Sequence, residues 1–408
     1  MVIVESAEKT ACRGDNQPLP RLLGARRGQG DEDQFIGFTR SLAHSPLLRR
    51  GAREFSAPSR ATRSLLSKSM DWRVSRGHRI MRCALLHSPR SRETFMFALM
   101  VACYACPLAA AERFSVSMPA WVGSLNFSPD GKQIAVGCAD SSSRVLDAAT
   151  GNESVALRGH EDYVASVAFS PDGKTLATGS YDRTARLWGI ESNRPRQTLS
   201  GHRGAVMSVA FSPDGKWLST GSLDTTVKLW NTTTGKLRAT LSGHTSWVNS
   251  VVFSADGQWL VSGSSDGTIR LWRVRSGKPE ATLNAADSEV RSVAISPDGK
   301  TLAAGVRYGA LKTWNLATRR EQFSIKAHES DVWSLAFSPG GHSLVSGDGD
   351  WNKPGEVKVW DTTRLRLRQT FATSGEVLSV ACSPDGRTIA AGCADGSVKE
   401  WAVEDELR

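Results

Sequence analysis

The chain has 408 residues, with 51 Lys and Arg against 41 Asp and Glu, a formal net charge of +10. Residues 1–111 hold 18 of the basic and 9 of the acidic side chains, so residues 112–408 carry 33 against 32 and are nearly neutral. This balance excludes the broad basic footprint of a nucleic-acid-binding domain, and the seven cysteines show neither metal-ligand spacing nor a short disulfide framework.

Residues 1–80 show no helical or strand periodicity and are rich in Arg and Ser. Such a composition cannot bury a core, so we expect this segment to be disordered if it is translated at all. A downstream Met stands at position 81, directly before the basic segment. We therefore also consider that translation starts at Met81 and that residues 1–80 were assigned upstream of the true start.

A targeting segment is predicted for residues 81–111. Three arginines between positions 82 and 92 precede an apolar run, Phe95–Leu108, which is followed by the small residues Ala109–Ala111. This order indicates a secretory signal peptide that is cleaved after Ala111, which would export the protein to the periplasm or the extracellular space. The alternatives are a signal anchor that contacts the membrane through residues 95–111, a lipid anchor at Cys103, and a cytoplasmic protein.

The rest of the chain is built from seven copies of one unit. The copies are marked by a five-residue turn motif at Phe127–Gly131, Phe169–Gly173, Phe211–Gly215, Phe253–Gly257, Ile295–Gly299, Phe337–Gly341 and Cys382–Gly386. The first residues of these motifs lie 42 residues apart five times and 45 apart once. Self-similarity at this period predicts a repeat architecture in which neighbouring units bury one another's faces.

Each unit predicts four short strands. "SVAF" and "TLATGS" are apolar and β-branched, and the SPDG between them supplies the Pro, Asp and Gly of a tight turn. A third strand ends in Trp, as in "VKLW", and a fourth reads "RQTL" or "RATL". Seven units of four antiparallel strands predict an all-β fold, a seven-bladed β-propeller over residues 112–408.

The N-terminal strand is expected to close the ring. The last unit ends near Val403 without a fourth strand, and "ERFSV" at Glu112–Val116 matches "EQFSI" at Glu321–Ile325, which is a fourth-strand segment. We therefore expect Glu112–Val116 to complete the last blade, because the sheet edges would otherwise stay open. A ring closed in this way predicts a monomeric propeller.

Gly-His, the SPDG turn and an Asp followed by Leu-Trp together resemble the WD-repeat (WD40, G-protein β-like) family over about residues 112–408. In that family a His, a Ser or Thr, an Asp and a Trp form a hydrogen-bonded structural tetrad within a blade. The resemblance implies four such sets here: His160, Thr178, Asp182 and Trp188; His202, Thr220, Asp224 and Trp230; His244, Ser262, Asp266 and Trp272; and His328, Ser346, Asp350 and Trp360.

The same residue types also build the active sites of nucleophilic hydrolases. A catalytic group is needed once and lies at a cleft, whereas four copies at the blade period favour a structural role. We therefore expect no catalytic residue and no enzymatic activity. The first, fifth and seventh units lack the tetrad His and have Met118, Ala286 and Thr373 in its place.

The resemblance also implies that one face of the propeller binds partners. Two positions in each unit point to that face: the sixth residue before the turn motif, and the residue before the tetrad Asp. The candidate partner-binding residues at these positions are Trp121, Tyr163, Tyr181, Leu223, Trp247 and Arg307. Exposed aromatics suit interface hot spots, but each ring could also pack only against its own loop. The longer turn at Trp351–Pro354 is either a recognition finger or a tolerated insertion.

The leading hypothesis is an exported, non-enzymatic scaffold that binds protein or peptide, without a cofactor and without nucleic acid. The alternative is a calcium-binding or small-ligand sensor, or a propeller enzyme. Its support is Glu289, Asp331 and Glu376, which follow one another on blades five to seven and whose oxygens suit Ca²⁺. Three carboxylates at surface positions are more often simply solvated, so we expect no metal site. The mature body keeps Cys138, Cys382 and Cys393, an odd number that leaves at least one thiol unpaired in a monomer.

Overall fold

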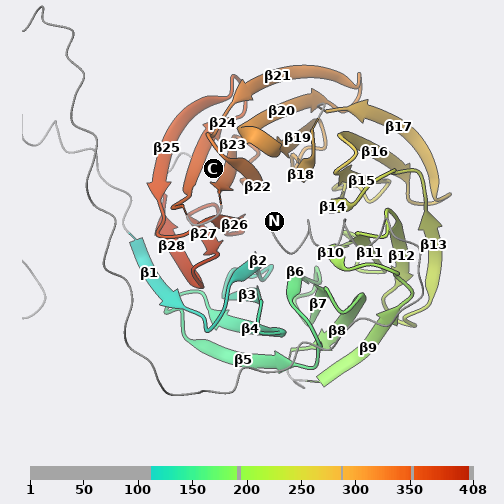
Figure 1. Ribbon diagram of the computed structural model, residues 1–408, viewed down its shortest axis with the longest axis horizontal. Coiled ribbons are helices and arrows are strands. Elements are labelled where there is room, and N and C mark those ends of the chain that lie inside the picture. The colour runs from blue at the N-terminus through green and yellow to red at the C-terminus, as the bar shows by residue number, and fades with distance from the viewer. Residues whose placement is uncertain (1–111, 191–193, 286–287, 351–352, 404–408) are drawn as a thin grey trace, which may run out of the picture. The chain divides into compact units, whose positions relative to one another are not determined.

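Seven sheets of four antiparallel strands follow one another around a ring (Figure 1). The computed structural model describes residues 112–403 apart from 191–193, 286–287 and 351–352. The upstream segment and the signal peptide predicted for residues 1–111 lie outside the described residues. The predicted all-β, seven-bladed propeller is confirmed. The described residues contain no helix long and apolar enough to cross a membrane.

The strands of a blade are called a to d from the channel outward. Blade one holds β2 (Val122–Phe127), β3 (Gln133–Cys138), β4 (Ser142–Asp147) and β5 (Glu153–Arg158). Blade two holds β6 (Val164–Phe169), β7 (Thr175–Ser180), β8 (Thr184–Gly189) and β9 (Arg194–Ser200). Blade three holds β10 (Val206–Phe211), β11 (Trp217–Ser222), β12 (Val227–Asn231) and β13 (Leu237–Leu241). Blade four holds β14 (Val248–Phe253), β15 (Trp259–Ser264), β16 (Thr268–Arg273) and β17 (Lys278–Asn284).

Blade five holds β18 (Val290–Ile295), β19 (Thr301–Val306), β20 (Ala310–Asn315) and β21 (Arg320–Lys326), with the short 3₁₀ turn η1 (Arg307–Gly309). Blade six holds β22 (Asp331–Phe337), β23 (Ser343–Gly349), β24 (Glu356–Asp361) and β25 (Arg366–Ala372). Blade seven holds β26 (Val377–Cys382), β27 (Thr388–Cys393), β28 (Ser397–Ala402) and β1 (Glu112–Ser117).

The SPDG motif makes the turn between strands a and b. In blade three the Ser212 hydroxyl donates to Asp214 Oδ1 (2.6 Å), which also accepts from the backbone N–H of Lys216 (3.1 Å). Gly215 follows with φ +68°, a left-handed conformation that glycine adopts without strain. Because strands alternate in direction, the a–b and c–d turns share one face of the ring, the SPDG face. The d–a connections and b–c turns form the opposite His–Asp face.

Apolar side chains fill the seams between blades. Leu229 of blade three packs in one buried cluster with Val248, Val251 and Trp272 of blade four, and the other seams repeat this arrangement. Burying such side chains contributes about 1.5–3 kcal/mol each. The blades are therefore held by their neighbours, as the repeat period predicts.

A second contact joins every blade to the next. Strand a pairs with another strand on one side only, so some of its N–H groups have no partner within the sheet and face the channel. In each blade a Ser of strand a accepts one such N–H from strand a of the following blade, at 3.0–3.2 Å. The acceptors are Ser124, Ser166, Ser208, Ser250, Ser292, Ser334 and Ser379. The series is closed, because Ser379 of blade seven accepts from Leu125 of blade one.

The N-terminal strand completes blade seven, as expected. β1 pairs antiparallel with β28, with Val116 opposite Val398. Arg113 of β1 donates to Glu400 of β28 at 2.7 Å. Glu400 is 0% exposed and stands at the position that Leu229 occupies in blade three. A buried carboxylate of this kind is costly without a partner, and Arg113 of the closing strand supplies the ion pair that compensates it.

We expect Ser166→Ala to lower the free energy of unfolding by about 1–3 kcal/mol, because the buried N–H of Val209 loses its acceptor. Urea denaturation would measure the change. The control is Ser242→Ala at an exposed Ser, which should alter stability by less than about 0.5 kcal/mol. Equal midpoints for the two variants would contradict a stabilising role for the serine ring.

Candidate interaction face

The structure brings the four residues of three predicted tetrads together. In blade two, His160 Nδ1 lies 2.6 Å from Asp182 Oδ2, His160 Nε2 lies 2.6 Å from Thr178 Oγ1, and Trp188 Nε1 donates to the same hydroxyl at 2.9 Å. Blades three and four repeat this geometry with His202, Thr220, Asp224 and Trp230, and with His244, Ser262, Asp266 and Trp272.

The donors and acceptors of a tetrad fix its proton order. The Trp N–H can only donate, so the hydroxyl accepts from it and donates to His Nε2, which leaves the His proton on Nδ1 facing the Asp. Burial lowers the pKa of His244 and keeps it neutral. Burial alone would raise the pKa of Asp266, but hydrogen bonds from Thr268, Thr245 N–H and His244 hold it at about 2.

These groups cannot act as catalytic triads. The hydroxyls of Thr178, Thr220 and Ser262 belong to fully buried residues, so no substrate carbonyl can reach them. Each hydroxyl is also already engaged by both the His and the Trp of its own blade. The arrangement satisfies buried polar groups and ties the b–c turn to the d–a connection.

The prediction for the sixth blade was wrong at one residue. Asp348, not Asp350, faces His328, with Oδ2 3.3 Å from Nδ1, while Ser346 accepts from Trp360 and contacts His328 Nε2. β23 continues through Gly349, so the buried acid lies at the end of the strand rather than in the turn. Asp350 lies beyond the strand, is exposed and pairs with Lys353.

Blade one replaces the tetrad by an ion pair. Arg144, which is buried, donates to Asp140 Oδ2 at 2.7 Å and to the Ser142 hydroxyl at 2.6 Å, and it also meets Glu153 at 3.0 Å. The spacing of four residues between Asp140 and Arg144 was visible in the sequence. The buried position of Arg144 was not, because the other blades carry Lys or Arg there as well.

The two positions predicted to form a binding surface lie side by side in every blade. In six blades the residue after strand b donates its N–H to the carbonyl of the residue before strand a, as from Tyr181 to Tyr163 (2.9 Å) and from Arg307 to Glu289 (2.9 Å). In blade six the equivalents, Gly349 and Asp331, pair in the ladder. The result is a ring of paired residues around the channel mouth on the His–Asp face.

An aromatic sector covers blades one to four of this ring. Trp121 is 40% exposed, and the rings of Tyr163 and Tyr181 lie 5.2 Å apart. Tyr163 reaches across to blade one, where a Cβ on Gly123 would lie 1.4 Å from its hydroxyl oxygen. Leu223 and Trp247 are half-buried. The tyrosines therefore pack on each other and on a neighbouring strand, while Trp121 presents the most open apolar surface of the sector.

An arginine network covers blades five and six. Arg291 of β18 contacts Glu289 Oε2 (2.6 Å) and Asp331 Oδ2 (3.1 Å), and its guanidinium lies 4.4 Å from the centroid of Trp333. Arg307 holds the other oxygen of Glu289 at 2.7 Å. The sequence did not reveal Arg291 or Trp333, because both stand inside strand a. Each stands two residues after a residue predicted to lie on this face, Glu289 or Asp331, and this spacing could have identified both.

The three carboxylates considered for calcium do not form a metal site. Glu289 and Asp331 are occupied by the guanidinium of Arg291. Glu376 is buried against Gly349, and burial raises the pKa of its carboxyl. Among the described residues, no group of three or more His, Cys, Asp or Glu side chains is arranged to hold a metal ion.

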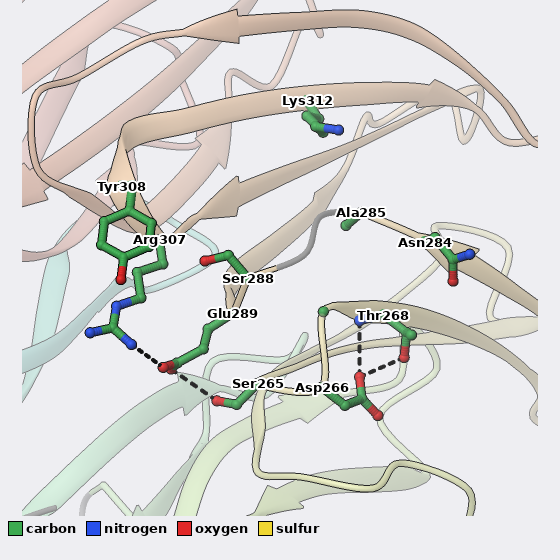
Figure 2. A pocket seen from close by; sticks show the side chains of 11 residues that line it. Ser265, Asp266, Thr268, Asn284, Ala285, Ser288, Glu289, Arg307, Tyr308 and Lys312 are labelled. Carbon is green, nitrogen blue, oxygen red and sulfur yellow. Dashed lines mark hydrogen bonds and ion pairs between the residues drawn. The ribbon is translucent and has the colours of Figure 1, made fainter. Parts of the chain in front are cut away.

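A pocket of about 810 Å³ opens between blades four and five (Figure 2). It is lined by the b–c turn of blade four around Ser265 and Asp266, and by Glu289, Arg307 and Tyr308 of blade five. Ser265 donates to Glu289 and so joins the pocket wall to the arginine network (Figure 2). Tyr308 stands in the tetrad Asp position with φ +64° and is 64% exposed, a surface aromatic that the sequence did not single out.

Two further sequence predictions concern the longer turn of blade six and the cysteines. Of the longer turn at Trp351–Pro354, residues 351–352 lie outside the described residues. Cys138, Cys382 and Cys393 carry free thiols, and burial raises their pKa to about 11, 12 and 11. These thiols therefore stay protonated and unreactive near neutral pH.

Comparisons with known proteins follow the blade pattern. Residues 114–147, 151–189 and 365–402 match a family model described as WD domain, G-beta repeat. Residues 189–354 match a model described as the IFT122 first beta-propeller. A search of curated proteins gave no match. Together the two models match residues 114–402 apart from 148–150 and 355–364.

We expect Asp348→Ala to lower the free energy of unfolding by about 1–3 kcal/mol, because the N–H of Glu356 loses its acceptor and the buried His328 loses the carboxylate that faces it at 3.3 Å. Asp350→Ala should change it by less than about 0.5 kcal/mol, since Asp350 is exposed. Thermal or urea denaturation of the two variants measures the difference. A larger loss for Asp350→Ala would restore the assignment made from sequence.

Proposed function

The chain is a WD-repeat β-propeller protein, and from this premise we propose that it is a non-enzymatic scaffold that binds a protein or peptide on its His–Asp face. WD-repeat propellers commonly act as protein-interaction scaffolds. The observation that carries the proposal is the ring of paired residues at the channel mouth, which sets the aromatic sector of blades one to four beside the arginine network of blades five and six.

The chemistry of this ring suits a protein partner. Aromatic side chains and arginines dominate the binding energy of protein interfaces, and they bind best where they are already rigid. Here the two tyrosines pack against each other and Arg291 is held by two carboxylates and a Trp. Binding would therefore order few side chains. The clamped arginines also have little charge to offer a nucleic-acid backbone, which favours protein over nucleic acid at this face.

The alternative classes have weaker support. An enzyme would need an accessible nucleophile or a general base, but the tetrad hydroxyls are buried and the thiols are held protonated. A calcium sensor would need free carboxylates, but Glu289 and Asp331 face Arg291. We propose that the propeller acts as a monomer, because β1 closes the ring within one chain.

We further propose that the protein is exported. The predicted cleavage after Ala111 would leave Glu112 as the first residue, and Glu112 is where β1 begins. Cleavage at that bond would therefore remove the targeting segment and spare every strand of the ring. The unpaired thiols of Cys138 and Cys393 are buried and that of Cys382 is half-buried, and their raised pKa is compatible with an oxidising compartment, since protonated thiols react slowly.

We expect Trp121→Ala combined with Trp247→Ala to weaken partner binding at least tenfold, since both aromatics lie in the aromatic sector. The partner would be cross-linked to the wild-type protein in the source cells, identified, and titrated against purified variants. The control is Leu237→Ala combined with Leu367→Ala, which removes exposed apolar side chains on the SPDG face. Equal affinities for the two double variants would reject the His–Asp face as the binding surface.

The N-terminus of the natively expressed protein tests the export proposal. Mass spectrometry should find Glu112 as the first residue. An intact start at Met81 or Met1 would contradict cleavage and favour an anchored or cytoplasmic scaffold. The matched variant is Ala109→Leu combined with Ala111→Leu, which should block cleavage because signal peptidases need small residues at these positions.

A further inference from the structure

The SPDG face carries a second surface that the scaffold function does not use. Each c–d turn, together with the start of strand d, lies at the outer edge of this face. In blades three to six these segments are residues 231–238, 273–280, 315–322 and 361–368, and they hold ten Lys and Arg against three Asp and Glu. Their net charge of +7 contrasts with +1 for residues 112–408 as a whole.

The exposed cations of these segments are here called the basic rim. They are Lys236, Arg238, Arg275, Lys278, Arg319, Arg320, Arg364, Arg366 and Arg368. The outer strands β13, β17, β21 and β25 follow one another along the circumference of the ring (Figure 1). Arg238 donates to the carbonyl of Arg275 (2.8 Å), and Arg319 meets Glu280 (3.0 Å). The rim is therefore continuous from blade to blade.

Most of the rim charge is not compensated within the fold. Arg319 pairs with Glu280 and Arg368 pairs with Asp361. In the part of the chain that the structure describes, the other seven rim cations make no ion pair with an acidic side chain. Seven like charges along one edge repel one another and create a local positive field. A partner of opposite charge would relieve that repulsion.

Two exposed leucines lie within the rim. Leu237 is 45% exposed between Lys236 and Arg238, and Leu367 is 51% exposed between Arg366 and Arg368. The rim therefore presents apolar side chains flanked by cations at two points, in blades three and six. Nearby aromatic faces are covered, since Arg238 stacks on Trp217 at 4.3 Å and Arg273 on Trp259 at 3.7 Å.

We propose that the basic rim docks the propeller on an anionic lipid bilayer. Lys and Arg near a negatively charged leaflet each add to the affinity, and flanked leucines can bury their side chains at the boundary between headgroups and acyl chains. Single-stranded nucleic acid would need open aromatic faces for base stacking, and the two tryptophans beside the rim are already occupied. With the rim on a bilayer, the His–Asp face points away and stays open to a protein partner.

Co-sedimentation of the full chain with vesicles tests this docking. The rim variant K236Q/K278Q/R320Q/R366Q removes four exposed cations that make no ion pair among the described residues. The control variant R158Q/R183Q/R203Q/K326Q removes four exposed cations from the His–Asp face. Both variants keep residues 1–111 and have the same net charge. Any difference between them therefore reports the surface and not the leader.

On vesicles of phosphatidylcholine with 30% phosphatidylglycerol, the rim variant should bind at least tenfold more weakly than wild type, and the control variant within twofold of it. Leu237→Ser combined with Leu367→Ser should weaken binding without changing its salt dependence. Equal binding by the rim and control variants would overturn the proposal. Tighter binding of the wild-type rim to DNA of random sequence than to these vesicles, at equal salt, would overturn the assignment to lipid.

Discussion

Every blade of this propeller has an inner strand with a ladder partner on one side only, and the fold depends on how the other side is satisfied. A backbone N–H that is shielded from water is costly unless it has an acceptor. Seven serines supply such acceptors, and each accepts one backbone N–H from the next blade. The series closes between Ser379 and Leu125. Closure by β1 at the outer edge and by the serine ring at the inner edge makes the blades mutually dependent.

The groups that hold the blades together are buried or lie within the turns, so the exposed side chains on both faces can vary from blade to blade. The serine ring, the apolar seams and the SPDG turns repeat in nearly every blade, whereas the tetrad is present in blades two, three, four and six. Blade one carries the Arg144–Asp140 pair instead, which holds the b–c turn of that blade and also meets Glu153 of strand d. Exposed side chains on the two faces are not part of the serine ring, the apolar seams or the tetrads, so they can serve in recognition.

Features that recur in every blade could be predicted from the sequence, whereas features that occur in a single blade could not. The period gave the blade number, and "ERFSV" gave the closing strand, because each is a copy compared with other copies. The acid of blade six was misplaced because "GDGD" offers two Asp residues, and only the length of β23 shows that Asp348 is the buried one. Arg291 and Trp333 were missed because only the residues before strand a and before the tetrad Asp were considered for this face, although alternate side chains of strand a face the channel. The recurring Ser was visible as well, but its role needs the neighbouring blade.

The net charge of the sequence also failed to reveal a local feature, the basic rim. Residues 112–408 sum to +1, which suggested a body without an electrostatic preference. The sum averages over positions that the fold places on different surfaces, while a binding partner meets only one of them. Because the c–d turns of successive blades are brought to one edge, cations that lie about 42 residues apart in sequence act as a single patch. In a repeat protein, charge is therefore informative when it is summed over equivalent positions of the repeat, and not along the chain.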